Sequence, residues 1–181
     1  MADEQALLRQ AHRMDANALA QIHDLYYPQI FRYIIFRVGD RQVAEDLTSD
    51  VFLRFLDALQ GRSSPLKSLR GWLYGVAGHI VSDYHRGRYR SKQVDLDDDL
   101  TNDQAGLEEQ LDANLQREQL QAAVASLTEE QQSVIALRFG QGLPIKEVAS
   151  IIDKSEGAVK QLQVRALGAL ARRLSLQGGD Q

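Results

Sequence analysis

The sequence predicts an all-α protein made of two small helical domains joined by an acidic flexible linker. Apolar residues recur at helical spacing along almost the whole chain, and no stretch shows the alternation typical of a strand. With 181 residues and 44% hydrophobic content, the chain can bury one large core or two small ones. The break is predicted at residues 93–106, where four Asp residues fall within five positions from Asp95 and the apolar period is lost.

The first domain, residues 1–92, is predicted to contain three helices. Pro28 should kink or divide the first helix, whose apolar face is formed by Leu19, Ile22, Tyr26, Ile30 and Tyr33. Gly39 ends this helix and Asp40 caps the next, which runs to Gly61 with an apolar face of Val43, Leu47, Val51, Phe55 and Leu59. The third helix carries the apolar stripe Leu69, Trp72, Leu73, Val76, Ile80 and Tyr84.

The second domain, residues 107–181, restarts the helical pattern. A first helix is expected from Leu107 onward, and Thr128 with Gln131 has the spacing of a capping box for the next. Gly140 and Gly142 should end that helix, after which Pro144 occupies a plausible first helical position. A short helix then carries Ile145, Val148, Ala149 and Ile152, and a final helix buries Val159, Leu162, Ala166, Leu170 and Leu174.

The last two helices have the spacing of a helix-turn-helix. A small residue, Ala149, falls where the two helices would cross, and Val159 anchors the second one. The turn position four residues after Ala149 needs a left-handed backbone, and Asp153 is one of the few non-glycine residues that tolerate it. An ordinary helical hairpin is the alternative reading of the same pattern.

The exposed face of the last helix favours DNA binding. Its polar residues combine cations for phosphates with side chains that can read base edges in the major groove. The candidate residues for this DNA contact are Ser155, Lys160, Gln161, Gln163, Val164 and Arg165.

Charge is distributed unevenly along the chain, although the net charge of -4 argues against a nucleic-acid partner at first sight. Residues 62–92 hold seven basic residues against one acid, Asp83, whereas residues 93–118 hold nine acids against one base, Arg117. The basic block lies beside Trp72, Tyr74 and other aromatic residues, a combination that single-stranded DNA binding uses. Trp72 by itself also fits a core position. The composition of the acidic stretch is that of a solvated spacer, which should keep the two domains from collapsing together.

Several classes of protein are disfavoured. The chain has no Cys, which fits a reducing compartment, and the cytoplasm is the expected location. No stretch has the roughly 18 apolar residues of a membrane span, so we expect no membrane insertion, and the start lacks signal-peptide character. The four His residues have no partner at metal-ligand spacing, and no phosphate loop or nucleophile turn occurs. We therefore expect no catalytic residue, no metal and no cofactor.

Four segments, in order, resemble a known family over nearly the whole chain. Residues 40–54 contain Ala44-Glu45-Asp46-Leu47 followed by an acid and Phe52-Leu53, and residues 69–77 contain Trp72-Leu73-Tyr74. Residues 127–139 and 155–160 supply the third and fourth segments. Together they are similar to bacterial RNA polymerase sigma factors of the extracytoplasmic-function (ECF) type within the sigma-70 family.

The resemblance implies a promoter-reading subunit that binds core RNA polymerase and promoter DNA and is regulated by an anti-sigma factor. The first domain would bind polymerase through one helical face, Asp46, Ser49, Asp50 and Leu53. The same domain would read the minus-ten element through Arg62, Lys67, Trp72, His79, Arg86, Arg88 and Arg90. The second domain would read the minus-thirty-five element, and the acidic linker would run toward the polymerase active centre.

Two departures limit what can be carried over from the family. His79 stands where the family commonly has Asn, and Ala158-Val159-Lys160-Gln161-Leu162 replaces a string with one more basic residue. Promoter preference therefore does not transfer. A stand-alone helix-turn-helix regulator would explain the second domain equally well, but it would not explain the Ala-Glu-Asp-Leu helix or the basic segment. A helical adaptor without a DNA role predicts no isolated basic block.

Overall fold

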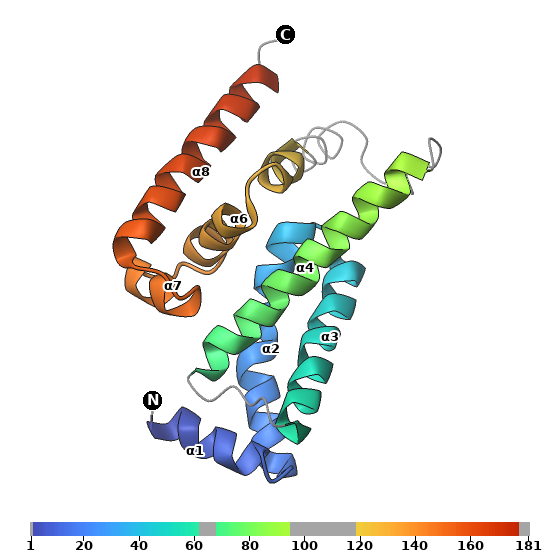
Figure 1. Cartoon of the computed structure of the whole chain (residues 1–181), viewed down its shortest axis with the longest axis vertical. Coiled ribbons are helices and arrows are strands. Elements are labelled where there is room, and N and C mark those ends of the chain that lie inside the picture. The colour runs from blue at the N-terminus through green and yellow to red at the C-terminus, as the bar shows by residue number, and fades with distance from the viewer. Residues whose placement is uncertain (1, 62–67, 95–118, 178–181) are drawn as a thin grey trace, which may run out of the picture.

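The computed structural model describes residues 2–61, 68–94 and 119–177, and every regular element in those ranges is a helix. Figure 1 shows two groups of helices lying side by side, with α8 on the outer edge of the second group. None of the helices in these ranges combines the length and apolar character that a membrane span needs. The elements are α1 (Ala2–Ala11), α2 (Ala16–Val38), α3 (Arg41–Gln60), α4 (Leu69–Val94), a helical segment at 119–125, α6 (Glu129–Ile135), the π-helix η1 (Ala136–Gly140), α7 (Ile145–Ile151) and α8 (Glu156–Gln177).

The first module is a bundle of α2, α3 and α4 with α1 packed against the start of α2. Its predicted apolar faces form the core, where Ile22, Ile30, Val51 and Leu73 are fully buried. Burial of each such side chain contributes about 1.5–3 kcal/mol. The predicted helix ends are confirmed at the junction of α2 and α3, since Gly39 has a left-handed backbone (φ 76°) and Asp40 accepts a hydrogen bond from the Val43 amide.

Pro28 neither divides nor ends the first long helix. The helix α2 continues through it from Ala16 to Val38. A proline inside a helix removes one hydrogen bond, yet Ile22 and Ile30 on either side of Pro28 are both fully buried. Packing of the apolar face on both sides of Pro28 therefore outweighs the local cost.

The N-terminal helix α1 was not among the predicted elements, and it supports α4 from outside the bundle. The carboxylate of Glu4 accepts hydrogen bonds from the amides of Leu69 and Arg70 at 3.0 and 3.3 Å. These two amides lie at the start of α4, where helical N–H groups lack partners within the helix. Glu4 thus caps a helix that begins 65 residues later.

The second module is built from the helices after residue 118. The predicted capping box is confirmed, because the Thr128 and Gln131 side chains each bond the other's backbone. The helix continues from α6 into η1 and ends at Gly140, and Gly142 in the turn that follows has a left-handed backbone (φ 68°). The helix α7 begins at Ile145, so Pro144 is its N-cap and lies one position before the first helical position expected for it.

The two modules are packed together, which contradicts the expectation that the acidic linker would hold them apart. Tyr33, Leu73 and Tyr74 of the first module share one continuous apolar core with Leu137 and Val148 of the second. The contact is made by apolar and mostly neutral polar groups of α2, α4, α6, η1 and α7, so the acids of the linker do not oppose it directly. The helix α4 ends at Val94, two residues inside the predicted linker, and the remainder of the linker lies outside the described residues.

Candidate functional site

The turn between α7 and α8 has the geometry of a helix-turn-helix. Asp153 has a left-handed backbone with φ 52°, as the sequence predicts, and the Lys154 amide closes the turn by donating to the Ala149 carbonyl at 2.9 Å. Val159 is fully buried and Ala149 is 6% exposed, so the two anchor positions hold the helices together. This arrangement leaves the opposite face of α8 available to a partner.

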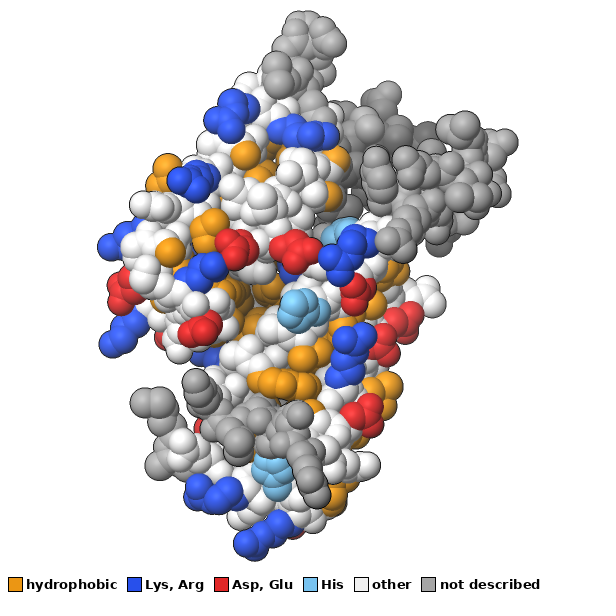
Figure 2. All heavy atoms as spheres, in the orientation of Figure 1, with side chains coloured by type: hydrophobic (Ala, Val, Ile, Leu, Met, Phe, Trp, Pro, Cys, Tyr) orange, Lys and Arg blue, Asp and Glu red, His pale blue; other side chains and the backbone are white. Residues whose placement is uncertain are grey.

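The outward face of α8 carries four of the six predicted upstream contacts. Lys160, Gln161, Val164 and Arg165 are all exposed, with Val164 exposed to 70%. Figure 2 shows basic side chains distributed over the outer side of the C-terminal helices. Cations next to an amide and an apolar side chain are the means by which a helix contacts phosphates, base edges and thymine methyl groups.

The other two predicted upstream residues have structural partners. Ser155 accepts a hydrogen bond from the Ala158 amide at 3.2 Å and so caps α8. Gln163 is half-buried, and its Oε1 accepts from Arg138 Nε at 3.1 Å, while Arg138 also donates to the Leu143 carbonyl. Gln163 therefore fixes α8 to the segment before α7, and it is less accessible to a base edge than Gln161.

The predicted downstream residues that can be located lie along α4. Trp72, His79 and Arg86 are seven residues apart, which puts them on one face of the helix. Trp72 is half-buried and packs on Phe55 with ring centroids 5.9 Å apart, so it serves the core as well as the surface. His79, Arg86 and Arg88 are exposed. Arg62 and Lys67 lie outside the described residues, as does the side chain of Arg90.

The predicted polymerase-binding residues form one exposed strip on α3. Asp46, Ser49, Asp50 and Leu53 follow the spacing of a single helical face and all four are exposed. Leu53 is 58% exposed, so it supplies an apolar contact within this strip. Figure 1 places α3 on the side of the bundle away from α7 and α8.

An aromatic cluster beside this strip was missed in the sequence. His23, Tyr27 and Phe31 follow one another at four-residue spacing on α2, and Phe52 of α3 packs against the first two, with ring centroids 5.1 Å from His23 and 5.9 Å from Tyr27. Arg41 lies over the Phe31 ring at 5.8 Å. The four-residue aromatic repeat is the signal that could have identified it. The cluster extends the apolar part of the α3 strip onto α2.

A cleft of about 410 Å³ opens between the two modules. It is lined by Tyr33, Arg37 and His79 from the first module and by Glu129 and Lys154, among others, from the second. A second space of similar size contains His85, whose pKa is lowered by burial and by the nearby Arg37. Within the described ranges, no group of His, Asp and Glu side chains has the arrangement of a metal site.

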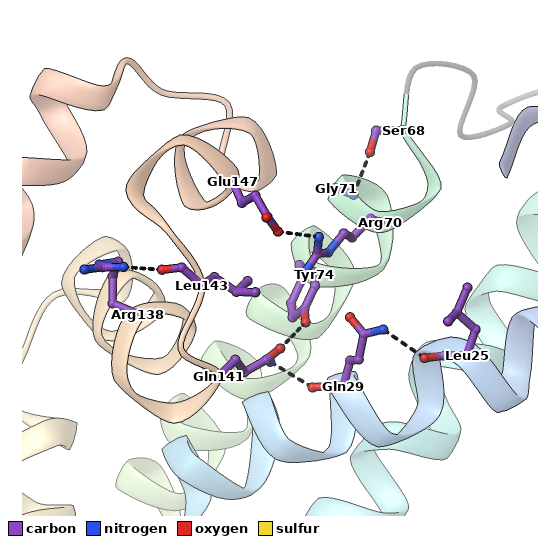
Figure 3. Close-up of polar contacts among 10 residues, drawn as sticks. All are labelled: Leu25, Gln29, Ser68, Arg70, Gly71, Tyr74, Arg138, Gln141, Leu143 and Glu147. Carbon is purple, nitrogen blue, oxygen red and sulfur yellow. Dashed lines mark hydrogen bonds and ion pairs between the residues drawn. The ribbon is translucent and has the colours of Figure 1, made fainter. Parts of the chain in front are cut away.

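Figure 3 includes the polar contacts between the modules near Tyr74, which also lines the cleft. The Tyr74 hydroxyl donates to Gln141 Oε1 at 2.6 Å, and the amide of Gln141 donates to the Gln29 carbonyl at 2.9 Å. Burial raises the pKa of Tyr74, so this hydroxyl stays protonated as a donor. Arg70 of α4 forms an ion pair with Glu147 of α7 at 2.8 Å.

Comparison with known proteins gives two family matches. Residues 22–91 match the family described as Sigma-70 region 2, and residues 123–172 match Sigma-70, region 4. The first match covers most of α2 to α4, and the second covers α6 to α8 with the helix-turn-helix.

Individual relatives agree with these matches. The ECF RNA polymerase sigma factor BldN of Streptomyces coelicolor is 34% identical over 170 residues, which are 93% of this chain and 64% of that protein. The ECF RNA polymerase sigma factor SigX of Bacillus subtilis is 30% identical over 164 residues, which are 86% of this chain and 82% of that protein. The solved structure of the sigma factor RpoE with the anti-sigma factor NepR from Bartonella quintana has the same fold, with a TM-score of 0.58, 21% identity, and coverage of 90% of this chain and 98% of that one.

Proposed function

Since this chain belongs to the ECF sigma factors of the sigma-70 family, we propose that it binds core RNA polymerase and directs promoter-specific initiation by reading the minus-thirty-five and minus-ten elements. The observation that carries this proposal is the pairing of a DNA-facing helix-turn-helix with a separate exposed strip on α3 in one chain. The region 2 match outside the helix-turn-helix argues against a stand-alone regulator, which would need no such module.

Each surface has its own role in the proposal. The α8 face, with Lys160, Gln161, Val164 and Arg165, reads the upstream duplex, where Gln161 is the base reader and the two cations contact phosphates. The α4 face and its basic continuation bind the downstream element when its strands separate, because cations and aromatic rings suit unstacked bases. The α3 strip binds polymerase. No catalytic step is assigned to any residue.

The partners and location follow from this role. Core RNA polymerase and promoter DNA are the proposed partners, and an anti-sigma factor is proposed as a third because the related RpoE is bound to one. A sigma factor acts where RNA polymerase acts, so the cytoplasm is the proposed compartment.

The proposal is tested by mixing the purified chain with sigma-free bacterial core polymerase and a genomic promoter library. We expect transcripts that start at a defined set of sites and that share one upstream and one downstream element. A chain that binds DNA sites of its own but never changes where core polymerase starts would contradict the proposal.

A further inference from the structure

A second pocket, next to the cleft that contains His79, has polar walls that the sigma factor role does not use. It has a volume of about 410 Å³ and is lined by Arg37 of α2, by Ser82, His85 and Arg86 of α4, and by Glu129 of the second module, among others. We call it the Ser82 pocket. Proteins hold small molecules in pockets of roughly 300–1,000 Å³. The Ser82 pocket is therefore large enough for a small ligand, and of the lining residues named here only Arg86 belongs to a surface proposed for DNA.

Two buried polar atoms in the wall of this pocket lack hydrogen-bond partners. Ser82 is only 4% exposed, and its Oγ has no partner among the described residues. The same holds for Nε2 of His85, which lies three positions further along α4 and thus on the same side of the helix. A buried polar atom without a partner is costly, so a ligand that supplied these two hydrogen bonds would be stabilised in the pocket.

His85 requires a hydrogen-bond donor from such a ligand. Burial and the nearby Arg37 lower the pKa of His85, so its ring is neutral at neutral pH. The ring also donates a hydrogen bond to the Arg37 backbone, and because Nε2 has no partner, the donating nitrogen is Nδ1. In a neutral imidazole whose Nδ1 carries the proton, Nε2 is an acceptor.

Arg37 gives the pocket a positive charge that nothing nearby balances. The side chain is 2% exposed, and three of its N–H groups donate to neutral side-chain oxygens at 2.9–3.1 Å. A guanidinium has five N–H groups, so two remain without an acceptor among the described residues. No carboxylate in those residues pairs with Arg37, whereas Arg86 pairs with both Asp83 and Glu129. A buried cation without a counter-ion favours an anionic ligand.

We propose that the Ser82 pocket binds a small oxyanion that carries one O–H group, as hydrogen phosphate and 2-hydroxy carboxylates do. The anionic oxygens pair with Arg37, the Ser82 hydroxyl donates to one of them, and the O–H of the ligand donates to His85 Nε2. Oxyanions without an O–H group, such as sulfate, are disfavoured because they leave the buried His85 acceptor unpaired. The site goes beyond the proposed sigma factor function and does not depend on it.

Two matched pairs of probes test the site on the full chain by isothermal titration calorimetry at neutral pH. Inorganic phosphate is compared with sulfate, and lactate with propionate, each pair at equal ionic strength. General attraction of anions to basic surfaces acts on both members of a pair, so only the O–H group distinguishes them. We expect phosphate or lactate to bind once per chain and at least tenfold more tightly than its partner. Binding of phosphate indicates a phosphate-bearing ligand and binding of lactate indicates a hydroxy acid, and either one supports the site.

Variants assign the binding to the pocket. Ser82→Ala removes the hydroxyl without adding bulk, so the affinity for the preferred probe should fall at least threefold. Ser175→Ala, which changes an exposed serine of α8 outside the pocket, is the matched control and should leave that affinity unchanged. His85→Phe keeps a ring but removes the acceptor, so the two members of each pair should then bind alike. Urea unfolding without added anion checks that each variant is folded, and the two serine variants decide the matter if His85→Phe is not.

The inference is overturned if neither phosphate nor lactate binds, if the members of both pairs bind the wild-type chain equally, or if Ser82→Ala binds the preferred probe as tightly as the wild type does. None of these results bears on the proposed function, which the transcription assay tests separately.

Discussion

Replacing Leu53 with Ala isolates the apolar part of the proposed polymerase contact. Leu53 is 58% exposed in the free chain, so a partner that covers it can bury little more than half of its surface. Full burial of a leucine contributes about 1.5–3 kcal/mol, and the 58% that is exposed corresponds to about 0.9–1.7 kcal/mol. Since 1.4 kcal/mol corresponds to a tenfold change in Kd, Leu53→Ala should weaken binding to core polymerase by roughly four- to sixteenfold.

The assay is titration of fluorescently labelled chain with sigma-free core, followed by anisotropy, alongside urea unfolding of each variant. Leu53→Ala should leave the free energy of unfolding nearly unchanged, because the side chain is already mostly in water. The matched control is Val51→Ala, two residues away on the same helix. Val51 is fully buried, so its truncation should lower the unfolding free energy by about 2 kcal/mol while leaving core affinity intact under folding conditions.

Charge reversal at Asp46 and Asp50 tests the polar part of the same strip. Both side chains are exposed, so replacing both with Lys should preserve helicity and abolish co-purification with core. If the Lys pair and Leu53→Ala both bind core as the wild type does, the α3 strip is not the polymerase contact and the assignment is refuted.

Three further outcomes are expected. Gln161→Ala should relax base preference at one or two upstream positions, whereas Lys160→Ala should weaken binding to all sequences and lower the salt slope by about one. Filter binding with promoter variants measures both effects. A Gln161 variant that keeps full upstream preference but loses strand opening would contradict this assignment. Joint replacement of Arg86 and Arg88 by Ala should spare upstream specificity and impair strand opening, as read by permanganate footprinting, and normal opening would remove these residues from the downstream contact. Burial raises the pKa of Tyr26 to about 12, above its ordinary value of 10.0, so its stabilising contribution is complete below pH 10 and is lost as the pH rises toward 12. The free energy of unfolding should therefore fall less between pH 8 and pH 11 for Tyr26→Phe than for the wild type, as measured by urea unfolding at both pH values. An equal fall would locate the alkaline sensitivity elsewhere.

Local features of the fold were predictable because each depends on a few neighbouring residues. The end of α2 at Gly39, the cap at Asp40, the capping box at Thr128 and the left-handed turn at Asp153 all follow from backbone preferences that a short string determines. The exposed faces of α3 and α8 follow likewise from helical period. Sequence and structure therefore agree most closely where the interaction spans less than about one or two turns of helix.

Features that depend on distant residues were not predictable in this way. No local pattern indicates that Glu4 caps α4, or that Arg37 meets Gln132 across 95 positions of sequence. The hydrogen bond between Gln163 and Arg138 was not foreseen for the same reason, since Arg138 lies in another element. The acidic linker suggested separation of the modules, but the energetics are decided by the surfaces that meet. Those surfaces combine apolar side chains and neutral polar groups with the ion pairs Arg70–Glu147 and Arg86–Glu129.

The ion pairs that α4 makes with the second module have a consequence for how the chain searches a chromosome. Most of the affinity of a cationic surface for random DNA comes from counterions released when its side chains replace them on the phosphates. Arg70 and Arg86 each have a carboxylate partner, Glu147 and Glu129, that would have to be displaced first. With roughly 10⁶–10⁹ competing sites in a genome, even a modest reduction of this nonspecific attraction keeps more of the protein in solution. There it can meet polymerase by diffusion, without being held on DNA that contains no promoter.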